Sequence, residues 1–164
     1  MDPRDAEDID PAQLDVVLAA LFAGLALNEQ VTGRLHAAGF ADLRFSHGFV
    51  FQHLVPGPLP VGELARRMDV SQQAASKAAA ELERLGYIER VPDPGDARVR
   101  RLALSERGRA AVAAGRVARA EVAAGLEATL GLRRASALRA ALLDVLDAAG
   151  GMAAVRARRV PPVR

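Results

Sequence analysis

The chain has 164 residues, of which 51% are hydrophobic, 4% aromatic and 26% charged, and its formal net charge is +2. This length allows one domain with a sizeable core or two small lobes, and the abundance of Ala and Leu favours helices. The absence of cysteine excludes disulfides, thiolate metal ligands and thiol redox chemistry within the chain. With no run of 18 apolar residues and an acidic N-terminus, we expect a cytoplasmic protein without a membrane span.

The small net charge hides an uneven distribution along the chain. Residues 1–15 contain six acids and one Arg, which gives −5. Residues 98–109 contain five Arg and one Glu, which gives +4, and four more Arg without an acid follow between 156 and 164. Local basic patches attract a polyanion even when the whole chain is close to neutral.

The N-terminal part is predicted to be a polar arm followed by a long helix. Residues 1–10 are acidic and are expected to form a flexible arm. Pro11 suits the first turn of a helix, and the helix is predicted to span residues 11–38. Its apolar stripe repeats at helical spacing through Leu14, Leu18, Leu21 and Leu25. At ~40 Å such a helix exceeds the needs of a small core, so we expect part of it to meet another chain.

Two shorter helices are predicted next. Residues 42–55 form the first, although Gly48 and the aromatic content leave a strand as the alternative. Its expected core positions are Phe45, Phe49, Val50 and Leu54. The Pro- and Gly-rich residues 56–60 form a loop, and a short helix then begins after Pro60 and ends near Asp69. The apolar side of this short helix consists of Leu64, Ala65 and Met68.

Residues 71–85 are predicted to form a helix with well-defined ends. Ser71 is a good N-cap, and Gly86 is placed to terminate the helix. At about 100° per residue, one arc is apolar and consists of Ala74, Ala75, Ala78, Leu82 and Leu85. The opposite arc carries amides, a hydroxyl and cations: Gln72, Gln73, Ser76, Lys77 and Arg84. Such groups near a helix N-terminus suit base edges and phosphates in a major groove, and a solvated helix face is the alternative.

The chain then changes from helical to strand periodicity. Residues 87–104 are predicted to form a β-hairpin with a dense turn at 93–97. Arg98 lies beside this tip, where a guanidinium can enter a narrow minor groove. Asp96 is expected on the same side of the strand, where a bidentate pair would hold Arg98; a weak surface salt bridge is the alternative.

The C-terminal part is predicted to be helical. Ser105 is expected to cap a helix over residues 105–128, and Gly131 separates it from a final amphipathic helix over 132–149. The basic tail, residues 150–164, is expected to be frayed.

These motifs occur in a fixed order within VGELARRMDVSQQAASKAAAELERLGYIER and DPGDARVRRLALSERG. The positions concerned are Leu64, Ala65, Leu82, Glu83, Gly86, Asp93, Asp96, Arg98, Leu102, Leu104, Ser105 and Gly108. In this ordered set the chain resembles the MarR family of winged helix-turn-helix transcriptional regulators. The resemblance covers residues ~40–110 well and the flanking helices by pattern and length only. The chain departs from the family pattern at His47, Gly48, His53 and Pro60.

The resemblance implies a mainly α fold with a small β-hairpin wing. It implies a winged helix-turn-helix DNA-binding lobe at 40–109 and a helical dimerisation lobe built from 11–38 and 110–149. A homodimer of this kind would bind double-stranded DNA, read a pseudo-palindromic operator through helix 71–85 and the wing at 87–104, and act as a repressor. The expected DNA-binding residues are Gln72, Gln73, Ser76, Lys77, Arg98, Arg100 and Arg101. Asp93 and Asp96 are expected to shape the wing.

Other functions have less support in the sequence. Many relatives bind a small effector, so a small aromatic molecule is a possible partner, and its candidate pocket residues are Phe22, His36, His47 and Phe49; core packing is the alternative role for them. No cofactor and no metal site are expected, because three His without Cys or a tight acidic cluster make a poor ligand set. The sequence contains neither a nucleophile–base pair nor a phosphate-binding loop, so it does not predict an enzyme. The remaining alternative is a winged-helix protein-interaction module without sequence-specific DNA binding, against which Gln73, Lys77 and Arg98 argue.

Overall fold

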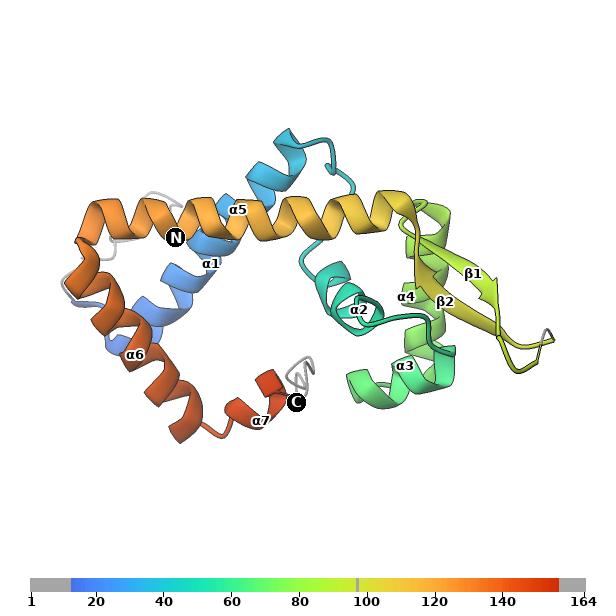
Figure 1. The fold of residues 1–164 in the computed structure, drawn as a ribbon. Helices are drawn as coiled ribbons and strands as arrows, with labels where there is room; N and C mark the ends of the chain where they lie inside the picture. Colours follow the sequence, from blue (N-terminus) through green and yellow to red (C-terminus); the bar gives the residue numbers. More distant parts are fainter. Residues whose placement is uncertain (1–12, 97, 157–164) are drawn as a thin grey trace, which may run out of the picture.

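The computed structural model describes residues 13–96 and 98–156, which form seven α-helices and one antiparallel hairpin (Figure 1). The elements are α1 (Val16–Ala37), α2 (His47–Leu54), α3 (Val61–Met68), α4 (Gln72–Arg84), β1 (Ile88–Pro92), β2 (Arg100–Leu104), α5 (Glu106–Leu130), α6 (Leu132–Ala148) and α7 (Met152–Arg156). The long helix α5 connects the hairpin and α2–α4 at one end to α6 at the other, and α1 crosses it. The predicted mainly α fold with a small β-hairpin is confirmed.

Helix α1 is shorter than predicted, because Asp15 caps it. The Asp15 carboxylate accepts hydrogen bonds from the backbone N–H groups of Val17, at 2.8 Å, and Leu18, at 2.9 Å. Pro11 and the predicted acidic arm lie outside the described residues. No residue of α1 is buried. By length and composition alone, α1 is also apolar enough to cross a membrane, a test that core helices of soluble proteins pass too.

Helix α2 begins only at His47, and residues before it form turns. The strand alternative for this segment is therefore wrong. Of the predicted core residues, Val50 and Leu54 are buried, but Phe45 is 64% exposed. Phe45 precedes the helix, and the turn that brings Leu43 into the core directs it outwards.

Helices α3 and α4 form a compact helix-turn-helix. The predicted apolar side of α3 (Leu64, Ala65 and Met68) is buried, as expected. Asp69 takes the left-handed conformation, with φ of 57°, and the Val70 N–H donates to the Ala65 carbonyl at 3.1 Å. These two features end α3 at Met68 and allow α4 to start at Gln72.

The predicted ends of α4 are confirmed. The Ser71 hydroxyl accepts from the Ala74 N–H at 3.1 Å. Gly86, with φ of 77°, lets the Tyr87 N–H return to the Leu82 carbonyl at 2.9 Å, which completes a Schellman motif.

The buried face of α4 differs from the prediction at two positions. Ala75, Ala79 and Leu82 are buried, whereas Ala74 is exposed. Ala79 therefore replaces Ala74 on this face, because the i, i+4, i+7 row is the one that packs against α3 and α2. The polar N-terminal half of α4 is left facing away from the core.

The hairpin pairs Ile88 with Leu104 and Pro92 with Arg100, so its tip spans 93–99 rather than 93–97. Leu59, in the Pro-rich loop, was not predicted to pair with it. Its N–H and carbonyl exchange hydrogen bonds with Leu102 at 3.0 and 2.9 Å. This third partner explains why residues 102–104 are all buried instead of alternating.

The hairpin joins α5 at a tight backbone crossing. The Ser105 hydroxyl accepts from the Gly108 N–H at 3.0 Å, as predicted for its cap, and donates to the Gly86 carbonyl at 2.6 Å. A Cβ placed on Gly108 would lie only 2.0 Å from the carbonyl oxygen of Tyr87. Only glycine fits here, so this position fixes how closely the start of α5 packs against the backbone at the start of the hairpin.

The C-terminal helices follow the prediction, with Gly131 separating α5 from α6. No residue of α6 is buried, and its exposed large apolar residues are Leu132, Leu138, Leu142, Leu143 and Val145. The predicted frayed tail instead begins with the short helix α7, and residues 157–164 lie outside the described residues.

Candidate nucleic-acid interface

The N-terminal half of α4 presents unpaired polar side chains. Gln72, Gln73 and Lys77 are exposed and Ser76 is half-buried. Within the described residues, none of these four side chains makes a hydrogen bond or ion pair. The first turn contains no acid, so the positive end of the helix dipole is not neutralised there. This surface can donate and accept hydrogen bonds with an external polyanion.

The acidic residues of α4 lie in its second half and are paired. Glu81 forms an ion pair with Arg44, in the turn before α2. Glu83 Oε2 lies 3.0 Å from Arg90 Nε on β1. These pairs tie α4 to its neighbours and keep carboxylates away from the polar N-terminal surface.

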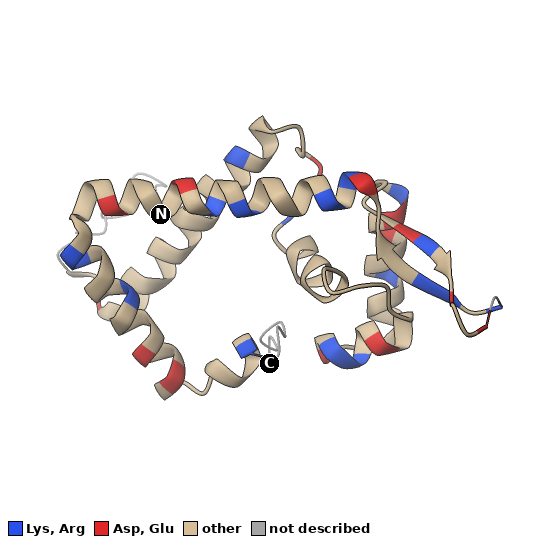
Figure 2. Cartoon of the chain, viewed as in Figure 1, with Lys and Arg blue, Asp and Glu red and all other residues tan. Residues whose placement is uncertain are grey.

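The arginines of α3 are also paired. Arg66 and Arg67 both bond Glu63, with nitrogen–oxygen distances between 2.6 and 2.8 Å. Their hydrogen bonds lower the pKa of Glu63 to about 2, so the carboxylate stays ionised at neutral pH. Figure 2 shows blue and red segments next to one another on α3.

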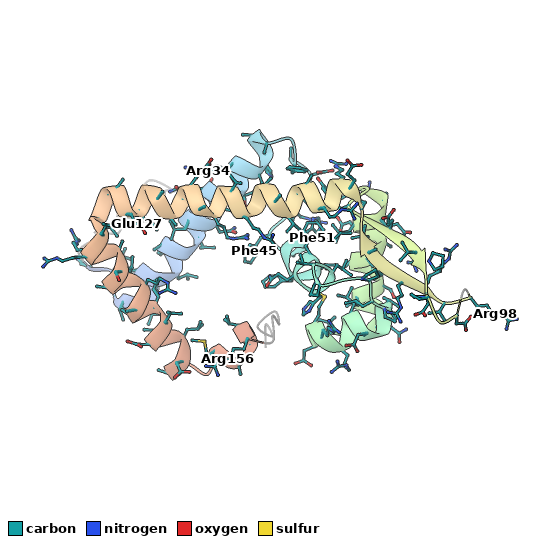
Figure 3. All side chains as sticks on the ribbon, in the orientation of Figure 1. Arg34, Phe45, Phe51, Arg98, Glu127 and Arg156 are labelled. Carbon is teal, nitrogen blue, oxygen red and sulfur yellow. The ribbon has the colours of Figure 1, made fainter. Side chains whose placement is uncertain are left out.

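The wing tip presents Arg98, which extends beyond the hairpin (Figure 3). The predicted bidentate pair is replaced by a different contact, because Asp96 Oδ1 accepts from the backbone N–H of Arg98 at 2.9 Å. An Asp in a tight turn commonly folds back onto the amide two residues on. The guanidinium of Arg98 makes no ion pair within the described residues and is free to bind elsewhere.

Asp93 braces the base of the tip. Its Oδ1 accepts from the Gly95 N–H at 2.7 Å, and its Oδ2 pairs with Arg101 Nε. The hydrogen bond from Gly95, then that from Arg101, lowers the pKa of the Asp93 carboxyl. Arg101 is half-buried in this pair, whereas Arg100 is exposed and unpaired among the described residues. Of the predicted wing cations, Arg98 and Arg100 are therefore the accessible ones.

A polar cluster that the sequence did not reveal fixes the C-terminal end of α4. The Tyr87 hydroxyl donates to Asp42, and Arg107 contacts the same carboxylate at 3.1 Å. Arg107 also lies 4.4 Å from the centre of the Tyr87 ring and donates to the Leu85 carbonyl at 2.7 Å. Burial and the Asp42 hydrogen bond raise the pKa of Tyr87 to about 12, and the same bond lowers the pKa of Asp42. The three residues lie far apart in the chain, so no local spacing signals the cluster.

A cavity of about 690 Å³ lies between α1, α2 and α5. Of the four predicted pocket residues, only Phe49 lines it. Phe22 is half-exposed on α1, and His36 is exposed with Nε2 3.4 Å from the Leu43 carbonyl. His47 is buried and its Nδ1 accepts from the Arg44 N–H at 3.2 Å. The sequence also missed the cationic lining of the cavity: Arg44, Arg116 and Arg119.

Comparison with known proteins agrees with this geometry. Residues 41–99 match the model of the MarR family. No curated protein matches the chain in sequence. Among solved structures, RV1404 from Mycobacterium tuberculosis has a TM-score of 0.69 at 23% identity, over 84% of this chain and 94% of that one. YusO from Bacillus subtilis has a TM-score of 0.62 at 24% identity, over 87% and 98%.

A MepR variant from S. aureus, bound to an oligodeoxyribonucleotide, has a TM-score of 0.58 at 18% identity, over 83% of this chain and 99% of that one. A second MepR structure contains ethidium bromide and has a TM-score of 0.60. At these identities the solved structures establish the shared fold. The chain is thus similar to the MarR family over residues 41–99 and shares the fold of these solved structures over most of its length.

Proposed function

We propose that this chain is a homodimeric, cytoplasmic transcriptional regulator that binds double-stranded DNA sequence-specifically and acts as a repressor. One observation carries the proposal. The polar side chains on the first half of α4 and the guanidinium of Arg98 are all unpaired within the described residues, whereas the carboxylates of α3 and α4 are all paired. A surface with this distribution suits a polyanion that offers both bases and phosphates.

Each part of the surface has a specific role in this proposal. The N-terminal half of α4 enters a major groove, where Gln72 and Gln73 can bond adenine edges and Lys77 guanine or phosphate. Arg98 enters the adjacent minor groove, whose negative potential attracts a guanidinium. Arg100 contacts phosphates. Asp93 and Asp96 act indirectly, by holding the turn that presents Arg98.

A homodimer is supported by the apolar surface that one chain leaves exposed. Leu21, Phe22 and Leu25 on α1 are 49–56% exposed, and Leu142 and Val145 on α6 are 48% and 59% exposed. Large apolar side chains exposed on two long helices indicate an interaction site, and a second copy is the occupant that two-fold DNA recognition requires. The two α4 helices of the dimer would read half-sites about one helical turn of DNA, 34–36 Å, apart.

We also propose that binding of a small molecule releases the protein from DNA. The cavity between α1, α2 and α5 has a volume in the range of small-molecule sites. MepR shares the fold, and separate solved structures of it contain DNA and ethidium. This supports binding of both DNA and a small molecule by the present chain.

The test is DNA binding by the wild type and Arg98→Ala against fragments of the region upstream of the protein's own coding sequence. We expect saturable binding at sub-micromolar protein that falls steeply with log salt, and at least about ten-fold weaker binding by Arg98→Ala. Arg84→Ala, on the second half of α4, is the matched control and should bind like the wild type. If no fragment binds and a genome-wide selection also fails, the protein-interaction alternative replaces this proposal.

A further inference from the structure

We propose that Ala74 is a specificity-determining residue, whose methyl group contacts the C5-methyl group of one thymine in each operator half-site. The inference rests on the proposed function and deepens it, because it names a base that α4 reads and the atom by which α4 recognises it. Among residues 72–77, Ala74 is the only exposed apolar residue. It follows Gln73 directly and lies one turn before Lys77.

The side chain of Ala74 is exposed, although the sequence pattern places Ala74 on the apolar arc of α4. Ala78 and Glu81 follow it on the same flank of the helix, one and two turns further along. Ala78 is half-buried against the core, and Glu81 pairs with Arg44 in the turn before α2. This turn therefore covers the flank at Glu81 and leaves Ala74 open. The methyl group of Ala74 is available to an external apolar group.

The first half of α4 has long side chains at its front and short ones on its flanks. At about 100° per residue, Gln73 and Lys77 point in similar directions, and Ala74 and Ser76 lie about 80° to either side of their mean direction. A helix with its side chains is about 10–12 Å across and a major groove is about 12 Å wide, so short flanking side chains let the helix enter deeply. The two flanks differ in chemistry, because Ser76 carries a hydroxyl group and Ala74 only a methyl group.

Thymine is the base whose major-groove edge matches an apolar flank. An A·T pair presents N7 and the N6 amino group of adenine, followed by O4 and the C5-methyl group of thymine. When Gln73 bonds the adenine, the adjacent methyl group of Ala74 meets the thymine methyl group. Ala74 loses no rotamer freedom in this contact, and its N–H donates to the Ser71 hydroxyl at 3.1 Å, which holds the first turn in place. The two contacts together distinguish A·T from T·A.

The first arm of the test removes the thymine methyl group alone. In an operator obtained by selection, each thymine is replaced in turn by deoxyuridine in both half-sites, and the affinity of the full chain is measured by fluorescence anisotropy. Burial of one methyl group corresponds to about four-fold in affinity. At one thymine position we expect about a fifteen-fold loss, because both half-sites contribute, and about a four-fold loss when only one half-site carries deoxyuridine there.

The second arm asks whether Ala74 is the partner of that thymine methyl group. Ala74→Gly removes the methyl group of the protein, so its affinities for the thymine and deoxyuridine operators should differ by less than about two-fold. Ala80→Gly, at another exposed alanine of α4, loses the same helix propensity and should keep the wild-type difference. Ala74→Ser places a hydroxyl group against the thymine methyl group and should show the same loss as Ala74→Gly. It provides the test if circular dichroism shows Ala74→Gly to be unfolded.

Three results would overturn the inference. In the first, the wild type prefers the operator to a scrambled duplex, but no deoxyuridine substitution weakens binding by more than about two-fold. In the second, Ala74→Gly and Ala74→Ser keep the wild-type difference, which would assign the methyl effect to another residue or to duplex stiffness. In the third, Ala80→Gly abolishes the difference as Ala74→Gly does. The unmodified duplexes test the proposed function separately, because equal binding of operator and scrambled duplex by the wild type would overturn that function and the inference with it.

Discussion

Among the glycines of the described residues, Gly108 is the one at which an added Cβ would have the least room. A methyl carbon there would lie 2.0 Å from the Tyr87 carbonyl oxygen, which is a backbone atom and not the end of a flexible side chain. We expect Gly108→Ala to lower the free energy of unfolding by about 3 kcal/mol, since a main-chain shift is needed to relieve the overlap. Urea unfolding followed by circular dichroism measures this.

The matched control is Gly125→Ala on the same helix, where a Cβ would meet nothing within 4 Å. There the gain in helix propensity should raise stability by up to about 1 kcal/mol. Equal effects of the two substitutions would show that the close crossing at Gly108 does not exist.

His47 gives the protein a pH-dependent stability. Burial, and then the nearby Arg44, lowers the pKa of His47 below its ordinary value of 6.5. As pH falls below about 6.5, the unfolded chain takes up a proton that the folded chain excludes, so the free energy of unfolding decreases. Urea unfolding between pH 7.5 and 5 should show a shallower decrease in His47→Gln than in the wild type. The control is His36→Gln, at an exposed histidine. If the free energy of unfolding of His36→Gln decreased with falling pH as little as that of His47→Gln, the assignment to His47 would be contradicted.

Single residues were predictable where their role is local. Ser71, Ser105 and Gly86 bond or turn within a few residues of themselves, so the sequence contains all that decides them. The contact of Asp96 was not predictable, because its carboxylate could reach either the backbone amide or the guanidinium of Arg98. The tip geometry decides between them, and it depends on how the whole hairpin twists.

At the scale of elements, the wing depends on its internal bracing. Asp93 holds both the Gly95 N–H and Arg101, so Asp93→Ala should loosen the tip and weaken DNA binding by about three-fold to ten-fold. The direction is diagnostic, because removal of a negative charge would by itself strengthen binding to DNA. Fluorescence anisotropy on a labelled operator measures the change. Tighter binding by Asp93→Ala would mean that net charge, rather than wing order, controls affinity.

Elements with clear helical periodicity between helix-breaking or capping residues were predicted closely, as α3, α4, α5 and α6 show. The start of α2 was missed, because residues 42–46 continue the helical pattern in the sequence but form turns before His47 in the structure. The Leu59 bridge was missed for a related reason. A single residue between prolines has no strand signal of its own and pairs only because α3 places it beside Leu102.

At the scale of the whole molecule, the proposed homodimer would form through the exposed apolar faces of α1 and α6. We expect the wild type to sediment at twice the chain mass, and Leu21→Glu/Leu142→Glu to sediment as a monomer, because two buried carboxylates in an apolar interface cost several kcal/mol. Val70→Glu, at an exposed valine next to α4, should remain dimeric. A dimeric Leu21→Glu/Leu142→Glu would place the interface on other surfaces.

The cavity is also a property of the whole molecule and was the part least open to prediction. Arg44 and Arg116 are 72 positions apart in the sequence and share a lining only because α2 packs against α5. The predicted pocket residues were chosen by type, as aromatics and histidines, and three of them lie elsewhere because the buried faces of α1 and α2 were not known. The surface proposed to read DNA lies on α4, which is one continuous segment, so its exposed polar residues could be listed from the sequence alone.

The measurement that tests the central claim most directly compares two duplexes of equal length, a selected operator and its scrambled version. Affinities of the wild type and of Gln72→Ala/Gln73→Ala would be determined for both at the same salt concentration. We expect the wild type to prefer the operator by about a thousand-fold or more, and the double variant to lose most of this preference while keeping its affinity for the scrambled duplex. Equal binding of the two duplexes by the wild type, or an unchanged preference in the double variant, would contradict sequence reading by α4.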